Sequence, residues 1–236
     1  MSPEVIDDLK RQAARRALDE IRDGMIVGLG TGSTARHFLD GVARLVQSGM
    51  DLKGVPTSFA TAEVAKELGI PLTSLEDRTP PDLCVDGADE VDPKLDLIKG
   101  LGGALLREKI VAAASKKFVV IVDESKLVPR LGSKVPVPVE VHPFGWRFAA
   151  DALETLGATV ELRRKDGDTF RTDNGNHIVD ARFRSLPSPV KTATQIMSIP
   201  GVVGHGLFLK MADTVLVGTE KAVRTLRTAR KPTRTS

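Results

Sequence analysis

The sequence of 236 residues is poor in aromatic side chains. It contains no tyrosine, a single tryptophan and only 4% aromatic residues in total. Proteins that bind single-stranded nucleic acid regardless of its sequence stack the bases on aromatic side chains, so this composition argues against that class. The same scarcity predicts an aliphatic core, built from Val, Leu, Ile and Ala.

Cysteine and long apolar runs are also scarce. Cys84 is the single cysteine and lies within an apolar run, which excludes an internal disulfide framework and favours a reducing compartment. No apolar stretch approaches the roughly 20 residues that a membrane-spanning helix needs. The acidic N-terminal segment does not resemble a signal peptide. We therefore expect a cytoplasmic protein with no membrane contact.

Metal-ligand patterns are missing as well. The four histidines are scattered and have no partner cysteines; they are His37, His142, His177 and His205. Because structural and catalytic metal sites require closely spaced ligands, no metal site is expected.

The formal net charge is +3, and much of the positive excess lies near the C-terminus. We interpret residues 231–236 as a disordered basic tail. A nucleic-acid-binding arm is the alternative, but no other feature of the chain supports it.

In the first half of the chain, helical and strand patterns alternate. Apolar residues recur every four positions across 3–22, and together with Ser2 and Pro3 this predicts an N-terminal helix. Buried strands are predicted at 25–30, 52–55, 83–85 and 118–122. Helices are predicted at 33–47, 60–68 and 104–116. Such alternation predicts βαβ units around a mostly parallel sheet.

The pattern changes after residue 131. Strand patterns occur at 134–141, 158–163, 177–183 and 202–209, and helix patterns occur at 144–156 and 188–198. The resulting order, β-α-β-β-α-β, is that of a ferredoxin-like unit. We therefore predict an inserted α+β domain at 132–210, within a larger domain formed by 1–131 and 211–230. A strand at 214–218 and a helix after it would return the chain to the larger domain.

A glycine-rich loop, Gly28-Leu29-Gly30-Thr31-Gly32-Ser33-Thr34, follows the first predicted strand. Placed before a helix, such a loop directs backbone N–H groups at an anion. The dinucleotide pattern G-x-G-x-x-G fails because Ser33 stands in place of the third glycine, and the lysine of a Walker loop is missing. A phosphate monoester therefore fits better than a nucleotide. The alternative is a tight turn in which Ser33 or Thr34 only caps the helix.

Acidic residues cluster directly after the predicted strand 83–85, in the stretch Asp86-Gly87-Ala88-Asp89-Glu90. Carboxylates at the carboxyl end of a buried strand are costly to desolvate, which is typical of catalysis or ligand contact. Lys99 and Glu108 follow, and an ammonium beside several carboxylates suits proton transfer on a small anionic substrate. Turn capping is a credible alternative for Glu90 and Asp92. Taken alone, the triplet 107–109 is typical of a solvated helix face.

Five motifs together resemble those of the type A ribose-5-phosphate isomerases, in the order and spacing of that family. They are Gly30-Thr31-Gly32-Ser33-Thr34, Asp86-Gly87-Ala88-Asp89-Glu90, Lys99-Gly100-Leu101-Gly102, Arg107-Glu108-Lys109 and Asp123-Glu124-Ser125-Lys126. The likeness continues through 136–140, 172–176 and 200–202, so it covers nearly the whole chain before the basic tail. A collinear set is far more specific than one glycine motif.

The resemblance implies an aldose–ketose isomerase of the non-oxidative pentose phosphate pathway. Such an enzyme interconverts D-ribose 5-phosphate and D-ribulose 5-phosphate through a cis-enediol(ate), without metal or nucleotide cofactor. By the same resemblance, Glu108 carries a proton between C2 and C1, Asp86 moves the hydroxyl proton between O1 and O2, and Asp89 assists ring opening. Lys99 and the backbone of Gly100, Leu101 and Gly102 would stabilise the enediolate oxygen.

The resemblance also implies a set of substrate-binding residues, with the loop 31–34 and Lys10 directed mainly at the phosphate. Beyond the residues already given roles, the set is Lys10, Thr31, Gly32, Ser33, Thr34, Gly87, Ala88 and Lys126. The fold implied is a Rossmann-like, mostly parallel sheet domain that carries a ferredoxin-like insert. Homodimers or homotetramers are usual in the family.

Two departures from the family pattern bear on the site. Leu101 stands where glycine is frequent, and Pro56-Thr57-Ser58-Phe59-Ala60 differs from a more polar stretch at the rim of the pocket. The alternative function is a non-catalytic sugar-phosphate-sensing domain of the same fold. A sensor would need a helix-turn-helix module, whereas residues 1–24 have room for one helix. A related lactonase or deaminase would place a histidine in the site.

Overall fold

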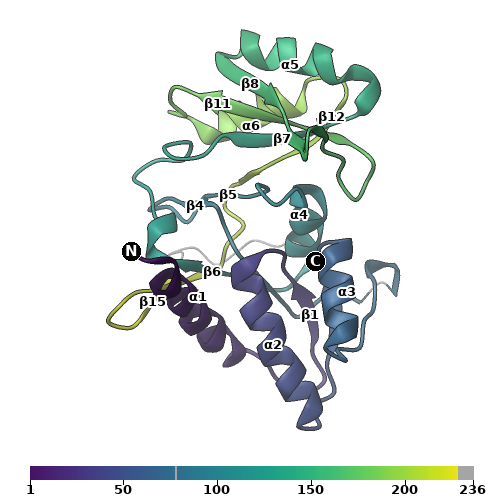
Figure 1. The fold of residues 1–236 in the computed structure, drawn as a ribbon, viewed down its shortest axis with the longest axis vertical. Coiled ribbons are helices and arrows are strands. Elements are labelled where there is room, and N and C mark those ends of the chain that lie inside the picture. Colours follow the sequence, from purple (N-terminus) through teal and green to yellow (C-terminus); the bar gives the residue numbers. More distant parts are fainter. Residues whose placement is uncertain (78, 228–236) are drawn as a thin grey trace. The chain divides into compact units, whose positions relative to one another are not determined.

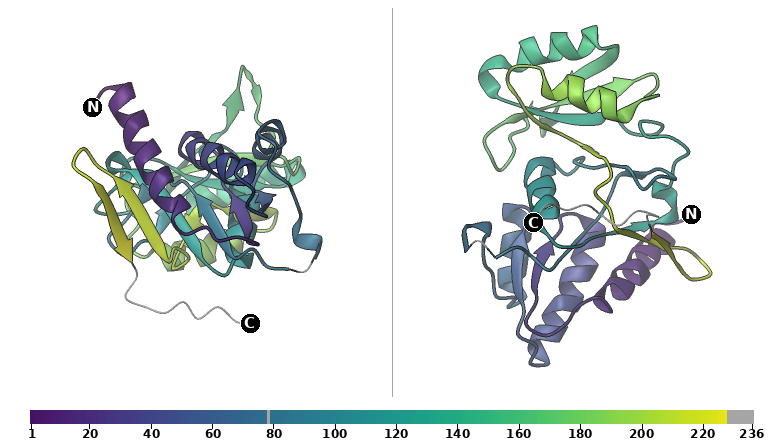
Figure 2. Two further views of the ribbon diagram at one scale, coloured as in Figure 1. Left: turned by 90° about the horizontal axis from the view of Figure 1, so that it is seen from below. Right: turned by 180° about the vertical axis from the view of Figure 1, so that it is seen from behind.

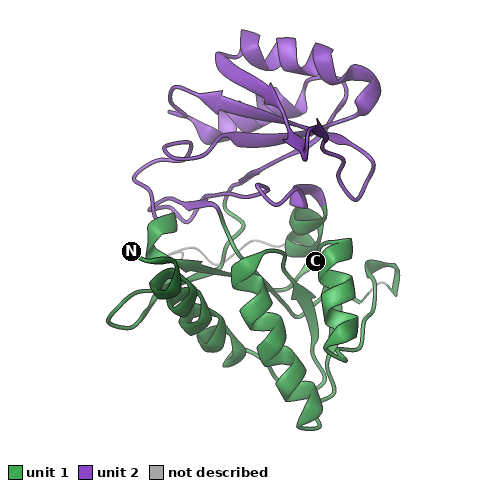
Figure 3. Cartoon of the chain, in the orientation of Figure 1, with its two compact units in different colours: residues 1–88, 107–126, 210–236 green, residues 89–106, 127–209 purple. Residues whose placement is uncertain are grey.

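The computed structural model describes residues 1–77 and 79–227, which form two compact units. The first unit contains 1–88, 107–126 and the described residues from 210 onward, and the second contains 89–106 and 127–209 (Figure 3). Each unit has its own hydrophobic core. Residues 231–236, for which a disordered tail is predicted, lie outside the described residues.

The first unit is built on a six-stranded sheet in the order β15-β14-β6-β3-β1-β2. Strands β1, β6 and β15 of this sheet are labelled in Figure 1. Its strands are β1 (Ile26–Leu29), β2 (Lys53–Pro56), β3 (Leu83–Asp86), β6 (Phe118–Asp123), β14 (Thr214–Gly218) and β15 (Val223–Arg227). Every neighbouring pair is parallel except β14 and β15. All residues of β6 are buried, as expected for a strand of a parallel sheet that is covered on both faces.

Helices of the first unit pack on this sheet. They are α1 (Pro3–Leu18), α2 (Ser33–Gln47) and α3 (Phe59–Glu67), and α4 (Leu105–Ala114) enters the unit at residue 107. The hydroxyl of Ser2 accepts the N–H of Val5, so α1 begins where the sequence predicts. α1 packs against α2, β6 and β14. The core of this unit is mainly aliphatic, with Phe38 and Phe118 as buried aromatic side chains, in agreement with the composition.

The segment after β14 differs from the prediction, because it forms the antiparallel strand β15 and not a helix (Figure 2). The hydroxyl of Thr219 donates to the carbonyl of Ala222 at 2.7 Å and accepts the N–H of the same residue at 3.3 Å. These bonds close a tight turn directly after β14. The turn reverses the chain, so residues 223–227 pair with the edge of the sheet before a helix can start.

The second unit contains a four-stranded antiparallel sheet in the order β12-β7-β11-β8. The elements follow one another as β7 (Val137–Val141), α5 (Trp146–Thr155), β8 (Ala158–Leu162), β11 (His177–Phe183), α6 (Pro189–Met197) and β12 (Val202–His205). This is the predicted β-α-β-β-α-β order of a ferredoxin-like unit. A short hairpin, β9 (Arg164–Lys165) and β10 (Asp168–Thr169), extends between β8 and β11.

Residues 89–106 group with the second unit, whereas the predicted boundaries place them in the larger domain. The reason is a small sheet in which β5 (Leu97–Ile98) pairs with both β4 (Glu90–Val91) and β13 (Leu207–Phe208). Pairing over such a sequence distance leaves no periodic signal in a single chain. None of the helices in the described residues is long and apolar enough to cross a membrane.

Candidate active site

Three predicted motifs of the first unit leave the same edge of its sheet. Strands β6, β3 and β1 are parallel neighbours, so the loops after them begin at one edge. These loops carry residues 30–34 after β1, 86–88 at the end of β3 and 124–126 after β6. The topology therefore brings together motifs that are far apart in the sequence.

The loop after β1 ends at the N-terminus of α2, where the predicted anion site lies. Gly32 is the N-cap residue of α2, with a φ of 106°, and no side-chain cap hydrogen bond is made there. The alternative in which Ser33 or Thr34 caps the helix is therefore wrong. With no acidic residue in the first turn, the N–H groups and the positive end of the helix dipole can serve an anion.

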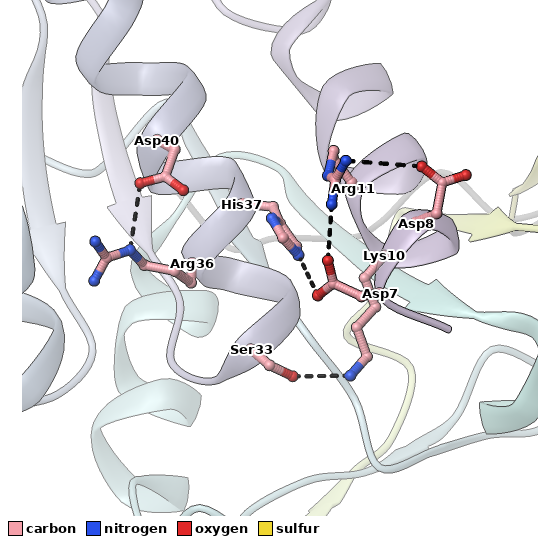
Figure 4. A network of polar contacts seen from close by, with 8 residues as sticks. All are labelled: Asp7, Asp8, Lys10, Arg11, Ser33, Arg36, His37 and Asp40. Atoms are coloured by element: carbon pink, nitrogen blue, oxygen red, sulfur yellow. Dashed lines mark hydrogen bonds and ion pairs between the residues drawn. The ribbon is translucent and has the colours of Figure 1, made fainter. Parts of the chain in front are cut away.

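Lys10 of α1 supplies a cation at this helix end. Its ammonium donates to the hydroxyl of Ser33 at 3.0 Å (Figure 4). One turn away, Nε2 of His37 lies 2.9 Å from Oδ1 of Asp7, and that contact also joins α2 to α1 (Figure 4). The hydrogen bond from the His37 side chain is the main reason why the pKa of Asp7 lies below its usual range. The positively charged side chain is thus held beside the hydroxyl and the helix N-terminus.

Thr31 fixes the loop to the protein. Its hydroxyl lies 2.8 Å from that of Thr57 and donates to that of Ser58 at 2.9 Å. The stretch 56–60, which departs from the family pattern, therefore provides the hydroxyl groups of Thr57 and Ser58 to this loop.

Asp86 ends β3 and is fully buried. Its Oδ1 accepts the backbone N–H groups of Thr31 at 3.1 Å and Gly87 at 2.7 Å. A Cβ at position 30 would lie only 2.3 Å from that oxygen and 2.6 Å from the Cα of Asp86, so only glycine fits beside the carboxylate. The turn-capping alternative for the acidic cluster therefore does not describe Asp86, which ties two loops together.

Glu108 lies in the first turn of α4 and is only 5% exposed. Its neighbour Arg107 stacks its guanidinium over the ring of Phe59, 4.1 Å from the centroid. Burial lowers the pKa of Lys109 to about 7. A solvated helix face would leave these side chains in water, so that alternative is wrong for this triplet.

Lys126 is positioned by the turn at the end of β6. Oδ1 of the buried Asp123 accepts the N–H of Ser125 at 3.0 Å and also the hydroxyl of Ser125. These bonds shape the 3-10 turn Glu124–Lys126. Lys126 therefore lies at the carboxyl edge of the sheet.

The second unit holds Asp89 and the turn that follows Lys99. Oδ2 of Asp89 accepts the N–H of Leu101 at 3.0 Å. The turn is closed by a hydrogen bond from the N–H of Gly103 to the carbonyl of Gly100, whose φ is 104°. Leu101 itself is 40% exposed and has no positive φ, so a leucine there is compatible with a turn that uses only its backbone.

Lys99 is buried, with 3% of its surface exposed. Its N–H donates to the carbonyl of Gly206 at 2.9 Å, and its ammonium lies 5.6 Å from the centroid of the Phe208 ring. The face of an aromatic ring attracts an ammonium electrostatically. Such a group is suited to stabilising an oxyanion.

Two further acidic residues have structural roles, but only Asp92 caps a local turn as the turn-capping alternative proposes, whereas Glu90 accepts hydrogen bonds from a segment that is remote in the sequence. Glu90 is fully buried, and its carboxylate accepts the backbone N–H groups of Gly132, Lys134 and Val135 at 2.6, 2.5 and 2.9 Å. Oδ1 of Asp92 accepts the N–H groups of Lys94 and Asp96 at 2.8 and 2.9 Å.

Arg163 is not among the residues predicted from the sequence, although its side chain contacts the carbonyls of Gly100 and Leu101. A single charged residue at the end of an alternating strand gives no sequence signal for such a contact. Within residues 1–77 and 79–227, no group of three or more His, Cys, Asp or Glu residues is arranged to hold a metal ion.

Residues 53–222 match the model of the family described as ribose 5-phosphate isomerase A (phosphoriboisomerase A). The chain belongs to the ribose 5-phosphate isomerase A family. The ribose-5-phosphate isomerase A of Rhodopseudomonas palustris (strain HaA2) is 52% identical over 230 residues, which cover 94% of this chain and 99% of that relative. That of Thermococcus kodakarensis is 47% identical over 224 residues, covering 93% and 97%.

Solved structures of the isomerase family give the same result. One is a D-ribose-5-phosphate isomerase in complex with phospho-erythronic acid, with a TM-score of 0.92 and 42% identity over 94% of this chain and 99% of that one. Ribose 5-phosphate isomerase A of Methanocaldococcus jannaschii has a TM-score of 0.90 and 44% identity at the same coverage. The expected fold class and the resemblance to this isomerase family are confirmed.

Proposed function

We propose that this protein interconverts D-ribose 5-phosphate and D-ribulose 5-phosphate, as an aldose–ketose isomerase of the non-oxidative pentose phosphate pathway. Membership of the ribose 5-phosphate isomerase A family carries this proposal. The alternative, a non-catalytic sugar-phosphate sensor, is not favoured, because the relatives that match 94% and 96% of this chain are named as the isomerase.

Glu108 is the proposed base. It removes the proton from C2 of the open-chain aldose, the electron pair forms the C1–C2 double bond, and the negative charge moves to O1. Asp86 transfers the hydroxyl proton from O2 to O1, and Glu108 returns its own proton to C1, which leaves the ketone at C2. The burial of both carboxylates supports these roles, because exclusion of water protects an enediolate from side reactions.

Asp89 and Lys99 are the proposed partners of the substrate oxygens. Asp89 assists ring opening, and the ammonium of Lys99 with the backbone of Gly100, Leu101 and Gly102 stabilises the negative charge on the enediolate oxygen. The burial of Lys99 and the defined hydrogen bonds of the turn after it support these roles. In other enzymes, removal of a single preorganised donor of this kind lowers kcat by a factor of about 10²–10³.

The phosphate is proposed to bind at the N-terminus of α2, against the N–H groups of the first turn and the hydroxyls of Ser33 and Thr34. Lys10 and Lys126 supply positive charge, and Gly32, Gly87 and Ala88 provide backbone close to the sugar. The lack of a side-chain cap at Gly32 and the Lys10–Ser33 contact support this assignment. Thr31 contributes by holding the loop in place.

We further propose that the enzyme works in the cytoplasm as a homodimer or homotetramer. Light scattering after gel filtration would give the mass, and a monomer under assay conditions would contradict this part of the proposal.

The function is tested with ribose 5-phosphate in a buffer that contains EDTA and no added cofactor. We expect turnover by the wild type and a loss of about 10²–10⁴ in kcat for Glu108→Gln, the usual contribution of a general base. Glu154→Gln, at an exposed position of α5, is the control with the same change of charge. Calorimetric binding of phospho-erythronic acid should persist in both variants. Wild-type turnover by Glu108→Gln would exclude Glu108 as the base.

A further inference from the structure

Arg163 links the ferredoxin-like sheet to the turn after Lys99. It follows β8 directly, and its backbone N–H donates to the carbonyl of Ile178 in β11 at 2.8 Å. From β11, Asp180 receives two hydrogen bonds from the guanidinium: Nε donates to Oδ2 at 2.8 Å and Nη2 donates to Oδ1 at 2.5 Å. The two side chains are 12% and 18% exposed. This bidentate, mostly buried pair fixes the plane of the guanidinium.

The third nitrogen of the guanidinium is used on the turn. Nη1 of Arg163 donates to the carbonyl of Gly100 at 2.8 Å and to that of Leu101 at 2.9 Å. One cation therefore contacts two successive carbonyl groups of the turn, while its other nitrogens are held by Asp180.

These contacts restrain the peptide group between Gly100 and Leu101 at both ends. Its carbonyl accepts from Arg163, and its N–H donates to Oδ2 of Asp89. Because a peptide unit is planar and trans, its C=O and N–H point in opposite directions, so opposite charges at the two ends resist rotation of the plane. The next carbonyl, that of Leu101, also accepts from Arg163. The N–H of Gly102 in the same peptide unit therefore points away from the guanidinium.

We propose that Arg163, oriented by Asp180, is a positioning residue for catalysis, which directs the backbone N–H of Gly102 at the enediolate oxygen. This inference rests on the proposed isomerase function. Donors act at full strength only if they are aimed before the charge develops. Misplacement by about 1 Å can cost roughly 10² in rate.

Arginine is required at this position because one planar guanidinium donates hydrogen bonds to a carboxylate and to two carbonyl groups at the same time. Lysine has a single nitrogen and can satisfy only part of this set. Arg164 is the natural control, since it is the next residue, is exposed and donates at 3.2 Å to the carbonyl of Gly167 in its own hairpin.

The experiment compares Arg163→Met, Arg163→Lys, Asp180→Asn and Arg164→Met as purified full-length proteins. Steady-state kinetics with ribose 5-phosphate gives kcat and KM, and hydrogen exchange read by mass spectrometry follows the peptide that contains residues 99–103. For Arg163→Met we expect kcat to fall by about 10- to 100-fold, as for a misplaced oxyanion donor, with KM nearly unchanged. Exchange in this peptide should become faster. Arg163→Lys and Asp180→Asn should lie between Arg163→Met and the wild type in both measurements.

Several outcomes would overturn the inference. These are a kcat of Arg163→Met equal to that of Arg164→Met, a loss confined to KM, and a loss of kcat without faster exchange in the turn. If Arg163→Met does not fold, the other two variants decide. The inference would be overturned if both Arg163→Lys and Asp180→Asn had the kcat of the wild type and the same exchange rate in the turn. Failure of the isomerase proposal would appear separately, as a wild type without turnover.

Discussion

The ammonium of Lys10 lies 3.0 Å from the hydroxyl of Ser33, so a cation from α1 stands at the first residue of α2. The Asp7–His37 contact one turn away holds the same two helices together. The positive charge is therefore in place before any ligand arrives, and little side-chain entropy remains to be lost on binding.

This relationship predicts that Lys10→Met weakens substrate binding and spares chemistry. We expect KM for ribose 5-phosphate to rise by about tenfold, equivalent to the ~1.4 kcal/mol of a partly exposed charged hydrogen bond. The kcat should stay close to that of the wild type. Arg15→Met removes one positive charge from an exposed position of the same helix and should leave both constants unchanged. A Lys10→Met enzyme with wild-type KM would remove Lys10 from the phosphate site.

Glu90 gives a prediction about stability. Its buried carboxylate serves three backbone N–H groups of the segment 132–135, so truncation leaves all three without their acceptor. At about 1–3 kcal/mol for each buried unsatisfied group, Glu90→Ala should lower the free energy of unfolding by about 3 kcal/mol or more. Glu90→Gln keeps an accepting oxygen and should cost less. Urea denaturation provides the measurement, and equal losses in the two variants would contradict the assignment.

The ion pair between Glu20 and Lys117 predicts a pH dependence of stability. Nζ of Lys117 lies 2.8 Å from Oε2 of Glu20, and this hydrogen bond is the main cause that holds the pKa of Glu20 below its ordinary value. A carboxyl with a lowered pKa in the folded state stabilises the fold above its unfolded pKa, about 4.3. That contribution is lost as the pH falls through the folded pKa.

Glu20→Gln should therefore lower the free energy of unfolding at pH 7 by about 0.5 kcal/mol, as for a partly exposed ion pair. The difference from the wild type should shrink as the pH falls through the folded pKa and vanish below it, where the carboxyl is protonated in both states. Glu63→Gln is the control, because the Glu63–Lys66 pair is 69% and 63% exposed and should contribute less. A difference that persists in acid would point to packing and not to charge.

Much of the fold could be predicted because local patterns are strong. The apolar run of β6 and the four-residue stripe of α1 correspond to the observed elements, and the second half gives the order of a ferredoxin-like unit. The strand β15 is not predicted, because the structure of residues 223–227 depends on the turn at 219–222 and not on their own secondary-structure propensity. Residues 89–106 were misplaced relative to the observed units because pairing of β5 with β13 is remote in sequence.

The site also contains residues that the sequence predicts and residues that it does not. Motifs identify residues that stand next to glycine turns or end a buried strand, such as Asp86 and Lys99. They carry no information on which side chain reaches a turn from elsewhere, as Arg163 does, or on which acid of a cluster has a structural role, as Glu90 does. Such assignments depend on contacts between segments tens of residues apart.

The missing side-chain cap of α2 has a thermodynamic consequence. In the proposed complex, the phosphate takes the place that a serine or aspartate occupies at most helix starts, so the ligand completes an element of secondary structure that the empty protein leaves unfinished. By linkage, the melting temperature should then rise with the concentration of sugar phosphate, and the largest gain in order should fall on the first turn of this one helix.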